Sequence, residues 1–448
     1  MSLLRRVAVL ATDGPIEPPR RGGGLDAEVL GSAQRIIDEV RSRGDEALFD
    51  YTERFDKARL TPETVRVTAE EIDAALASVG ADFIEAITSA AIAIEDFHRR
   101  TLPTSWFTTQ EGGIFLGQKV TPIRRVGIYI PGGRASYPST VLMNAIPAGV
   151  AGVEEIAMVV PPAADGTVSP YVLAAAVEAG VTEIYKVGGA QAIAALAYGT
   201  ETVPRVDKIC GPGNAYVTAA KKLVTGDVGI DMLAGPSEVL VLADDTADPD
   251  FVAADLMAQA EHDPKAAVYL VTVEPALVDE VESALATLLA ESDRSEIIET
   301  SLRDNGVAYV CDDVATAIDV ANAVAPEHLE LMMANPLELL SEIRDAGAIF
   351  MGPWTPESVG DYVAGPNHTL PTGGTARFSS PLSVEDFVKK SSVVSYSAEA
   401  LEADGPTILT LAAAEGLTSH ARAVSLRLER MAEMDVEDTP WPVDGGDA

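Results

Sequence analysis

Four of the five histidines in this 448-residue chain lie in short segments that also carry Gln, Glu or Asp. The densest segment is Gly360–His368, which offers the carboxylate of Asp361, the imidazole of His368, a phenol and an amide. Gly365 and Pro366 interrupt the segment, and these residue types favour loops. We therefore expect a loop that presents polar side chains to a ligand, with a polar surface turn as the alternative.

A second candidate pair, Gln259 and His262, stands three residues apart on a predicted helix. Asp248 is a good N-cap for this helix, Pro249 suits its first position, and Pro264 ends it. Residues three apart share a helix face. The pair would thus act together at the end of a helix that follows a strand, where α/β proteins expose functional groups.

Glu327 and His328 are adjacent and follow Pro326. If they lie on a helix, their side chains point about 100° apart and can serve one substrate from two sides. Two acid/base groups side by side suit proton transfer. A helix N-terminus that merely holds a stray glutamate explains the pair equally well.

Near the C-terminus, Glu415 and His420 flank a predicted corner between two helices. Gly416 is read as the stop of one helix and Thr418 as the N-cap of the next. Such a corner would bring the carboxylate and the imidazole together.

Four of these side chains form a ligand set for a metal ion. The imidazoles of His262 and His420, the amide oxygen of Gln259 and the carboxylate of Asp361 suit zinc or a similar divalent cation. Their spacing matches no known short zinc motif.

Three glycine-bearing turns could receive phosphates at a helix N-terminus: Tyr129–Gly133, Gly188–Gln191 and Gly211–Tyr216. The third begins like a dinucleotide fingerprint but lacks its last glycine. A purely structural strand-to-helix turn is an equally good explanation of each.

The charge balance narrows the class of protein. Acidic residues number 69 against 32 basic ones, for a formal net charge of -37, and such a surface repels nucleic acids. Lysine is scarce, with nine residues, so adaptation to high salt is a hypothesis. Cys210 and Cys311 are too few for a disulfide framework. No apolar run reaches membrane-spanning length and Met1–Leu10 does not resemble a signal peptide, so we expect a cytoplasmic protein.

Short apolar runs alternate with alanine-rich helical patterns through the middle of the chain, which predicts parallel sheets covered on both faces. Residues 26–100 read as helices, residues 1–25 as an arm, and residues after 381 as a helical tail without strands that ends in a frayed acidic stretch. The strand count favours two α/β units. The predicted strands are Val126–Ile130, Ile156–Val160, Glu183–Val187, Lys208–Cys210, Val239–Leu242, Val268–Val273, Val307–Val310 and Ala348–Phe350.

Taken together, eight motifs in this order resemble the histidinol dehydrogenase family over about Leu25 to Arg427. They are Tyr129–Gly133, Val187–Ala194, Gly211–Asn214, Gly235–Glu238, Gln259–His262, Pro326–Leu329, Gly360–His368 and Glu415–Arg422.

The resemblance implies a site. Zinc would be held by Gln259, His262, Asp361 and His420, and NAD would contact Tyr129, Gln191 and Asn214. The implied substrate contacts are Ser237, Gln259, His262, Glu327, His328, Asp361, His368, Glu415 and His420.

The resemblance also implies an architecture: two Rossmann-like, doubly wound parallel-sheet domains with a small N-terminal arm and a helical C-terminal segment. Residues 26–128 and 239–381 would form the first domain, with most substrate and metal residues, and residues 129–238 the NAD-binding one. Residues 382–448 would swap onto the partner of a homodimer, where Glu415 and His420 complete the neighbour's site.

The implied reaction is a four-electron oxidation of L-histidinol through the aldehyde to L-histidine, with two NAD, at the end of histidine biosynthesis. Zinc would orient the substrate through its amino and imidazole nitrogens. His328 would remove the hydroxyl proton and Glu327 would activate the water that hydrates the aldehyde. No motif holds a cysteine, which disfavours a thiohemiacetal route.

Three rival interpretations remain at this stage. A zinc hydrolase would use Glu327 as base on a metal-bound water. A dehydrogenase of another hydroxylated substrate would be expected to lack Glu415 or His420, and a non-catalytic binding protein would show losses at Glu327, His328 or Asp361. All these residues are present, which favours histidinol oxidation.

Overall fold

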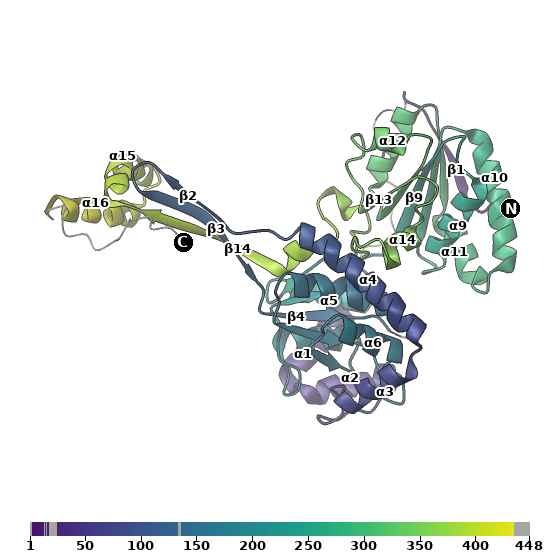
Figure 1. Ribbon diagram of the computed structural model, residues 1–448, viewed down its shortest axis with the longest axis horizontal. Coiled ribbons are helices and arrows are strands. Elements are labelled where there is room, and N and C mark those ends of the chain that lie inside the picture. Colours follow the sequence, from purple (N-terminus) through teal and green to yellow (C-terminus); the bar gives the residue numbers. More distant parts are fainter. Residues whose placement is uncertain (1, 13, 15, 18–24, 133–135, 434–448) are drawn as a thin grey trace. The chain divides into compact units, whose positions relative to one another are not determined.

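The computed structural model describes residues 2–12, 14, 16, 17, 25–132 and 136–433 and divides into two compact units. Unit 1 comprises Met1–Leu102 and Pro122–Phe387, and unit 2 comprises Pro103–Thr121 and Val388–Ala448 (Figure 1). Gly133 of the first glycine turn and the acidic stretch after residue 433 lie outside the described residues.

Unit 1 contains a six-stranded sheet, sheet A, whose strands are all parallel. Its order is β1 (Arg5–Val9), β11 (Val307–Cys311), β10 (Ala267–Thr272), β9 (Glu238–Ala243), β12 (His328–Met332) and β13 (Ala348–Met351). From β9 onward the chain fills one side of the sheet and then the other, which is the doubly wound arrangement.

The side-chain alternation of the strands explains how sheet A is covered on both faces. Val239, Val241 and Leu270 pack with one set of helices, whereas Leu240 and Val271 pack with another. The first set is α9 (Pro249–Ala260), α10 (Pro275–Glu291) and α11 (Ser295–Asn305), and the second face is covered by α12 (Val314–Val324). Two short helices, α13 (Pro336–Leu339) and α14 (Glu357–Tyr362), follow β12 and β13.

The second sheet of unit 1, sheet B, is also fully parallel. Its order is β6 (Glu183–Tyr185), β5 (Glu155–Val159), β4 (Arg125–Tyr129), β7 (Lys208–Cys210) and β8 (Gly229–Ile230). Helices α5 (Pro138–Val150), α6 (Pro170–Glu178), α7 (Gly189–Tyr198) and α8 (Ala215–Val224) connect the strands. All eight predicted strands are present, and the two-sheet Rossmann-like class is confirmed.

The N-terminal helices cover sheet B, which corrects their expected place in the first domain. They are α1 (Ala27–Arg43), α2 (Asp45–Asp56), α3 (Ala69–Ser78) and α4 (Ala81–Arg100). Helix α1 packs on α7 and α8. Helix α3 packs on α6, and α4 packs on α5 (Figure 1). Their apolar stripes predict a buried face but do not specify which sheet buries it.

Two further expectations were wrong. The arm contains strand β1, which pairs with β11, and the residues after 381 contain strand β14 (Val388–Tyr396). In unit 2, β14 pairs with β3 (Ile114–Pro122), which is antiparallel to β2 (Trp106–Gln110). Strands β2 and β14 are largely exposed, so they lack the apolar alternation that marks a half-buried strand.

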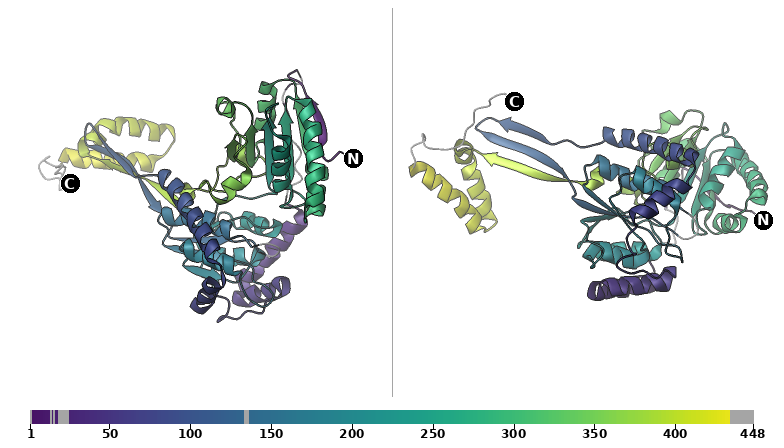
Figure 2. Two further views of the ribbon diagram at one scale, coloured as in Figure 1. Left: turned by 45° about the vertical axis from the view of Figure 1, so that its right-hand side comes forward. Right: turned by 60° about the horizontal axis from the view of Figure 1, so that its bottom comes forward.

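Unit 2 ends in two helices, α15 (Ala398–Ala414) and α16 (Thr418–Glu433), that pack on each other (Figure 2). Gly416 adopts a φ of 71° between them, which confirms the predicted corner. Within the described part of the chain, no single helix is long and apolar enough to cross a membrane, and only the pair α3 and α4, bent by 108°, reaches that length together.

Candidate active site

The polar side chains of sheet A gather at the amino ends of its strands. Gln259 lies in the last turn of α9, and His328 is the first residue of β12. A helix that follows a parallel strand runs back along the sheet, so its C-terminal end meets the amino ends of the neighbouring strands. The site therefore differs from the usual α/β position beyond the carboxyl ends.

Gln259 is fully buried and its amide lies among acceptors. One terminal atom lies 3.1 Å from Glu357 Oε2 and 3.2 Å from the Glu238 carbonyl oxygen. An amide oxygen at this position would have only hydrogen-bond acceptors as neighbours and no hydrogen to donate to them. This atom is therefore the amide nitrogen, which donates to both groups. The amide oxygen points the other way and keeps its lone pairs for a ligand.

Three side chains form a potential metal cluster. Ligand atoms of His262, Glu357 and Asp361 lie within 4.8 Å of one another, and His262 Nε2 is 4.0 Å from Glu357 Oε1. His368 Nδ1 lies 3.8 Å from Asp361 Oδ1. The structure thus places four of the predicted site residues near one another: Gln259, His262, Asp361 and His368.

Glu357 was missing from the predicted site. It starts α14 directly after Pro356 and stands four residues before Asp361, so the two carboxylates share a helix face. The Pro-Glu start of a helix and the spacing of four would have been the signals in the sequence. Asp361 correspondingly lies in a helix, and the expectation of a loop holds only for the residues after Tyr362.

Glu327 and His328 are close together, but not on a helix as predicted. His328 opens strand β12, a short apolar strand whose pairing with β9 and β13 overrides the local pattern. Glu327 Oε2 accepts from the Glu238 backbone N–H at 3.0 Å and lies 3.9 Å from His328 Nδ1. Both side chains are buried.

His328 Nδ1 has two polar neighbours. It lies 3.2 Å from the Glu238 carbonyl oxygen, which can only accept a hydrogen bond, and 3.1 Å from the Gln259 amide nitrogen, which can only donate one. In the tautomer with its proton on Nδ1, the ring donates to the Glu238 carbonyl and Nε2 keeps a lone pair; in the other tautomer, Nδ1 accepts from Gln259. Burial lowers the pKa of His328 to about 3, so the imidazole is neutral at physiological pH.

Burial controls the protonation of the other site groups as well. It raises the pKa of Glu327 and of Glu357 well above the usual range, and that of Asp361 to about 6. It lowers the pKa of His262, and that of His368 to about 4. Repulsion from the Asp361 and Glu327 carboxylates raises the pKa of Glu357 further.

The buried carboxyls lack a cationic side chain to balance them. Among the described residues, Glu327, Glu357 and Asp361 form ion pairs only with histidines. Buried carboxylates are ordinarily paired or coordinate a metal. A divalent cation is thus the partner that this arrangement fits.

A second group of predicted residues lies at the carboxyl ends of sheet B, where the strand order reverses between β4 and β7. Tyr129 is buried, and its hydroxyl accepts from the Gly189 N–H at 3.0 Å. Gln191 is 1% exposed, yet neither amide atom has a partner within the described residues. Asn214 is exposed and caps α8. Such a switch point is where α/β sheets bind nucleotides.

Comparison with known proteins agrees with this geometry. The histidinol dehydrogenase family model matches residues 20–428. Histidinol dehydrogenases of Syntrophotalea carbinolica and Geobacillus kaustophilus are each 56% identical, over 88% of this chain and 91% and 93% of their own. The chain belongs to the histidinol dehydrogenase family. It is therefore an oxidoreductase of histidine biosynthesis that oxidises histidinol.

A solved structure supports the fold assignment. Histidinol dehydrogenase from Elizabethkingia anophelis is 39% identical and superposes with a TM-score of 0.90, covering 96% of this chain and 99% of that one. The fold class of this family member thus rests on both sequence and structure.

Two site residues predicted for this histidinol dehydrogenase lie in unit 2. Glu415 follows the last residue of α15, and His420 lies in the first turn of α16. Both are exposed on that unit. Their part in the site stays a prediction. The remaining predicted residue, Ser237, directly precedes β9 and lies close enough to the Glu327 carboxyl to oppose the rise in its pKa.

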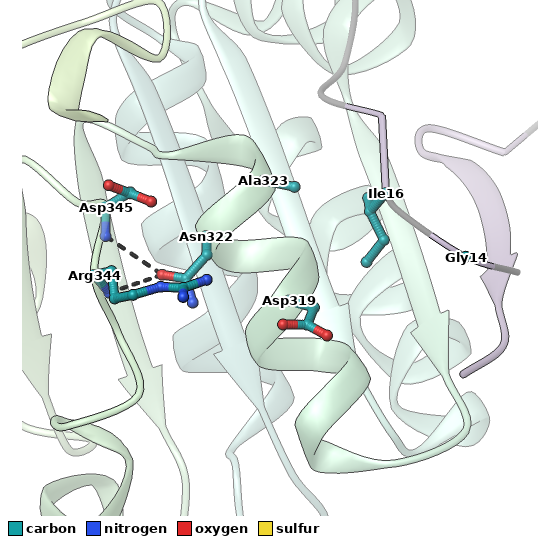
Figure 3. Close-up of a pocket in the computed structure, with 7 residues that line it drawn as sticks. All are labelled: Gly14, Ile16, Asp319, Asn322, Ala323, Arg344 and Asp345. Carbon is teal, nitrogen blue, oxygen red and sulfur yellow. Dashed lines mark hydrogen bonds between the residues drawn. The ribbon is translucent and has the colours of Figure 1, made fainter. Parts of the chain in front are cut away.

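The enzyme also has a surface cavity of about 320 Å³ beside α12 (Figure 3). Gly14, Asp319 and Arg344 are among its lining residues, and none belongs to the predicted site. The Asn322 side-chain oxygen accepts from the backbone N–H groups of Arg344 and Asp345 at 2.8 and 3.3 Å. The Asn322 side chain already forms hydrogen bonds with the backbone of this segment, so we assign the cavity no ligand.

Proposed function

We propose that the chain oxidises L-histidinol to L-histidine in two steps, with zinc at the site of sheet A and two NAD as hydride acceptors. The observation that carries the proposal is the cluster of exposed His262, buried Glu357 and half-buried Asp361, to which no lysine or arginine of the described residues forms an ion pair. A bound cation would balance the charge of these carboxylates, and it would lie near His328, the candidate base.

The zinc ligands in this proposal are Gln259, His262 and Asp361, with His420. Mixed nitrogen and oxygen donors suit zinc. Bound there, zinc would orient the substrate through its amine and imidazole nitrogens. Glu357 accepts the Gln259 amide hydrogen at 3.1 Å, so it holds the amide oxygen toward the ligand.

His328 is the base in both oxidations. In the tautomer that carries its proton on Nδ1, that N–H donates to the Glu238 carbonyl oxygen and the Nε2 lone pair is free to take the substrate hydroxyl proton. NAD would accept the hydride that leaves the carbon bearing this hydroxyl group. The neutral, buried imidazole keeps water away from this proton transfer.

Glu327 prepares the second oxidation. It would take a proton from a water that adds to the aldehyde, and His328 would then deprotonate the hydrate. This role requires the carboxylate form, whereas burial raises the pKa of Glu327. A nearby divalent cation favours that form, which couples water activation to metal binding.

Further substrate contacts are assigned by the match of motifs. Ser237 and His368 lie near Glu327 and Asp361 respectively. In a swapped homodimer, Glu415 and His420 of the partner subunit would join them.

The dinucleotide is assigned to the carboxyl ends of sheet B, with contacts to Tyr129, Gln191 and Asn214. The support is the buried Gln191 amide, whose two polar atoms lack partners in the described structure. Such a group costs free energy unless a ligand or water satisfies it.

We further propose a homodimer in which unit 2 swaps onto the partner. Unit 2 exposes large apolar side chains, which mark interaction surfaces when they cluster. Its exposed residues include Trp106, Phe107, Val394, Tyr396, Leu411 and Leu417. A cytoplasmic location suits the free, buried Cys210 and Cys311.

The test is the amount of NADH produced per L-histidinol consumed, with zinc in high salt, before and after a strong chelator. Two NADH per substrate, lost on chelation and restored by zinc, are expected. One NADH would contradict the second oxidation, and full turnover after chelation would contradict the metal. Turnover without nicotinamide would favour a zinc hydrolase.

A further inference from the structure

A buried ion pair lies beneath the Gly211–Asn214 turn of sheet B. Lys221 is in the second turn of α8, and Asp231 directly follows β8. Their side chains are 3% and 1% exposed, and Lys221 Nζ contacts Asp231 Oδ1. Neither residue is among the predicted site residues.

Both side chains also bind the first residue of the turn. Asp231 Oδ2 accepts from the Gly211 N–H at 2.8 Å, and Lys221 Nζ donates to the Gly211 carbonyl at 3.0 Å. The ion pair and Gly211 therefore close a ring of three interactions. One peptide residue is held at its donor and its acceptor by charged groups, whose hydrogen bonds are stronger than neutral ones.

The position of Gly211 links this ring to two candidate dinucleotide contacts. Gly211 has a φ of 105°, and a Cβ atom there would lie 2.2 Å from the Tyr129 carbonyl oxygen. The turn thus passes directly over the end of β4. Three residues later Asn214 begins α8 by accepting from the Tyr216 and Val217 N–H groups.

Stability alone does not explain such a pair. Burying two charges costs desolvation free energy, and well-packed apolar residues of similar size often stabilise a protein equally well or better. What an apolar pair cannot do is bind the Gly211 peptide groups. The function of the pair lies in the conformation of the turn.

We propose that Lys221 and Asp231 are positioning residues for the dinucleotide: they hold the Gly211–Asn214 turn in the conformation that binds it. The proposal rests on the assignment of NAD to sheet B. Neither side chain touches the dinucleotide. The pair sets the affinity for NAD and leaves the histidinol site at sheet A unchanged.

The chain offers a matched control in the same sheet. Arg125 and Glu183 form a buried pair at 2.5 Å, with side chains 4% and 19% exposed. They lie at the amino ends of β4 and β6, the edge opposite the turn. Removing either pair destabilises sheet B, but only one pair contacts the turn.

The test compares Lys221→Met/Asp231→Leu with Arg125→Met/Glu183→Gln as zinc-loaded full-length proteins, well below their unfolding midpoints. The first variant should raise the KM for NAD and the Kd for NAD measured by calorimetry by about tenfold, as expected for the loss of one or two hydrogen bonds. Its KM for L-histidinol should change less than about twofold. The control should keep both KM values.

An unchanged KM and Kd for NAD in the first variant, or an equal rise in the control, would overturn the inference. If the first variant does not fold, Lys221→Met/Asp231→Asn retains an acceptor for the Gly211 N–H and should shift NAD binding in the same direction by less. Wild-type protein that does not bind NAD would instead overturn the proposed function, and this inference with it.

Discussion

Glu357 connects the residues of the candidate metal site. Its Oε2 accepts a hydrogen bond from the Gln259 amide nitrogen at 3.1 Å. Its Oε1 lies 4.0 Å from His262 Nε2 and 3.7 Å from His328 Nδ1. It is also 3% exposed, so its charge is little screened by solvent. Orientation of ligands by a buried carboxylate is a common device at metal sites.

Replacing Glu357 with Gln should weaken zinc binding. The substitution keeps the shape but removes a negative charge, and a loss of about 10- to 100-fold in affinity is expected for such a change. Competition with a coloured chelator measures it. Glu338→Gln, at an exposed position of α13, is the control, and equal affinities of the two variants would exclude a role for Glu357.

Glu327→Gln should separate the two oxidations. Without the carboxylate no group activates the water, so aldehyde should form while its oxidation slows by roughly 10²- to 10⁴-fold. Quenched reactions analysed for histidinal and histidine give the ratio. An equal loss of both steps would show that Glu327 acts elsewhere in the reaction.

His98 predicts a pH dependence of stability. It is 1% exposed, neither ring nitrogen has a partner in the described structure, and burial lowers its pKa from 6.5 to about 4. Between these values the unfolded chain binds a proton and the folded chain does not, so stability falls as pH falls from 6.5 to 4. The contribution is on the order of 2 kcal/mol, allowing for solvent screening.

His98→Phe removes this group from the comparison. The difference in unfolding free energy between variant and wild type should shift in favour of the variant by that amount between pH 7 and pH 4. Urea denaturation at the two pH values measures it. A constant difference would mean that His98 keeps its proton in the folded state.

At the scale of elements, the segment after α14 is fixed by contacts with the helices of sheet B. Asn367 Nδ2 donates to the Met143 carbonyl of α5 at 2.6 Å. Gly365 has a φ of 100°, and a Cβ atom there would lie 2.6 Å from the Ala93 carbonyl of α4. This close approach sets where Asp361 and His368, on either side of it, can lie.

Gly365→Ala should therefore impair both stability and zinc retention. Left-handed backbone costs an alanine about 1–2 kcal/mol, and the contact with Ala93 adds to this. Gly352→Ala is the control, because Gly352 has a φ of 85° but nothing within 4 Å of its Cβ position. If thermal unfolding and zinc content change equally in both variants, the helix contact does not matter.

At the scale of the whole molecule, a swapped dimer makes a test by hybrids possible. In a mixture of Glu327→Gln and His420→Asn chains, half of the sites in each hybrid dimer would be intact. Neither chain alone should complete the oxidation to L-histidine, and refolding the two together should restore about a quarter of the wild-type rate of L-histidine formation. Each chain refolded alone is the control, and no recovery in the mixture would show that each chain supplies its own site.

The sequence alone determined the eight central strands, because short apolar runs bounded by turns and helix caps are local signals. It also singled out Gln259, His262, Asp361 and His368, which the structure places near one another, while their roles and the dinucleotide contacts stay predictions. Only the tertiary structure decided that His328 lies on a strand, that Glu357 joins the cluster, and that α1–α4 cover sheet B. Strands β2, β3 and β14 were also not predicted from the sequence pattern. Each of these depends on partners far away in the chain, and no local pattern records which partner an element meets.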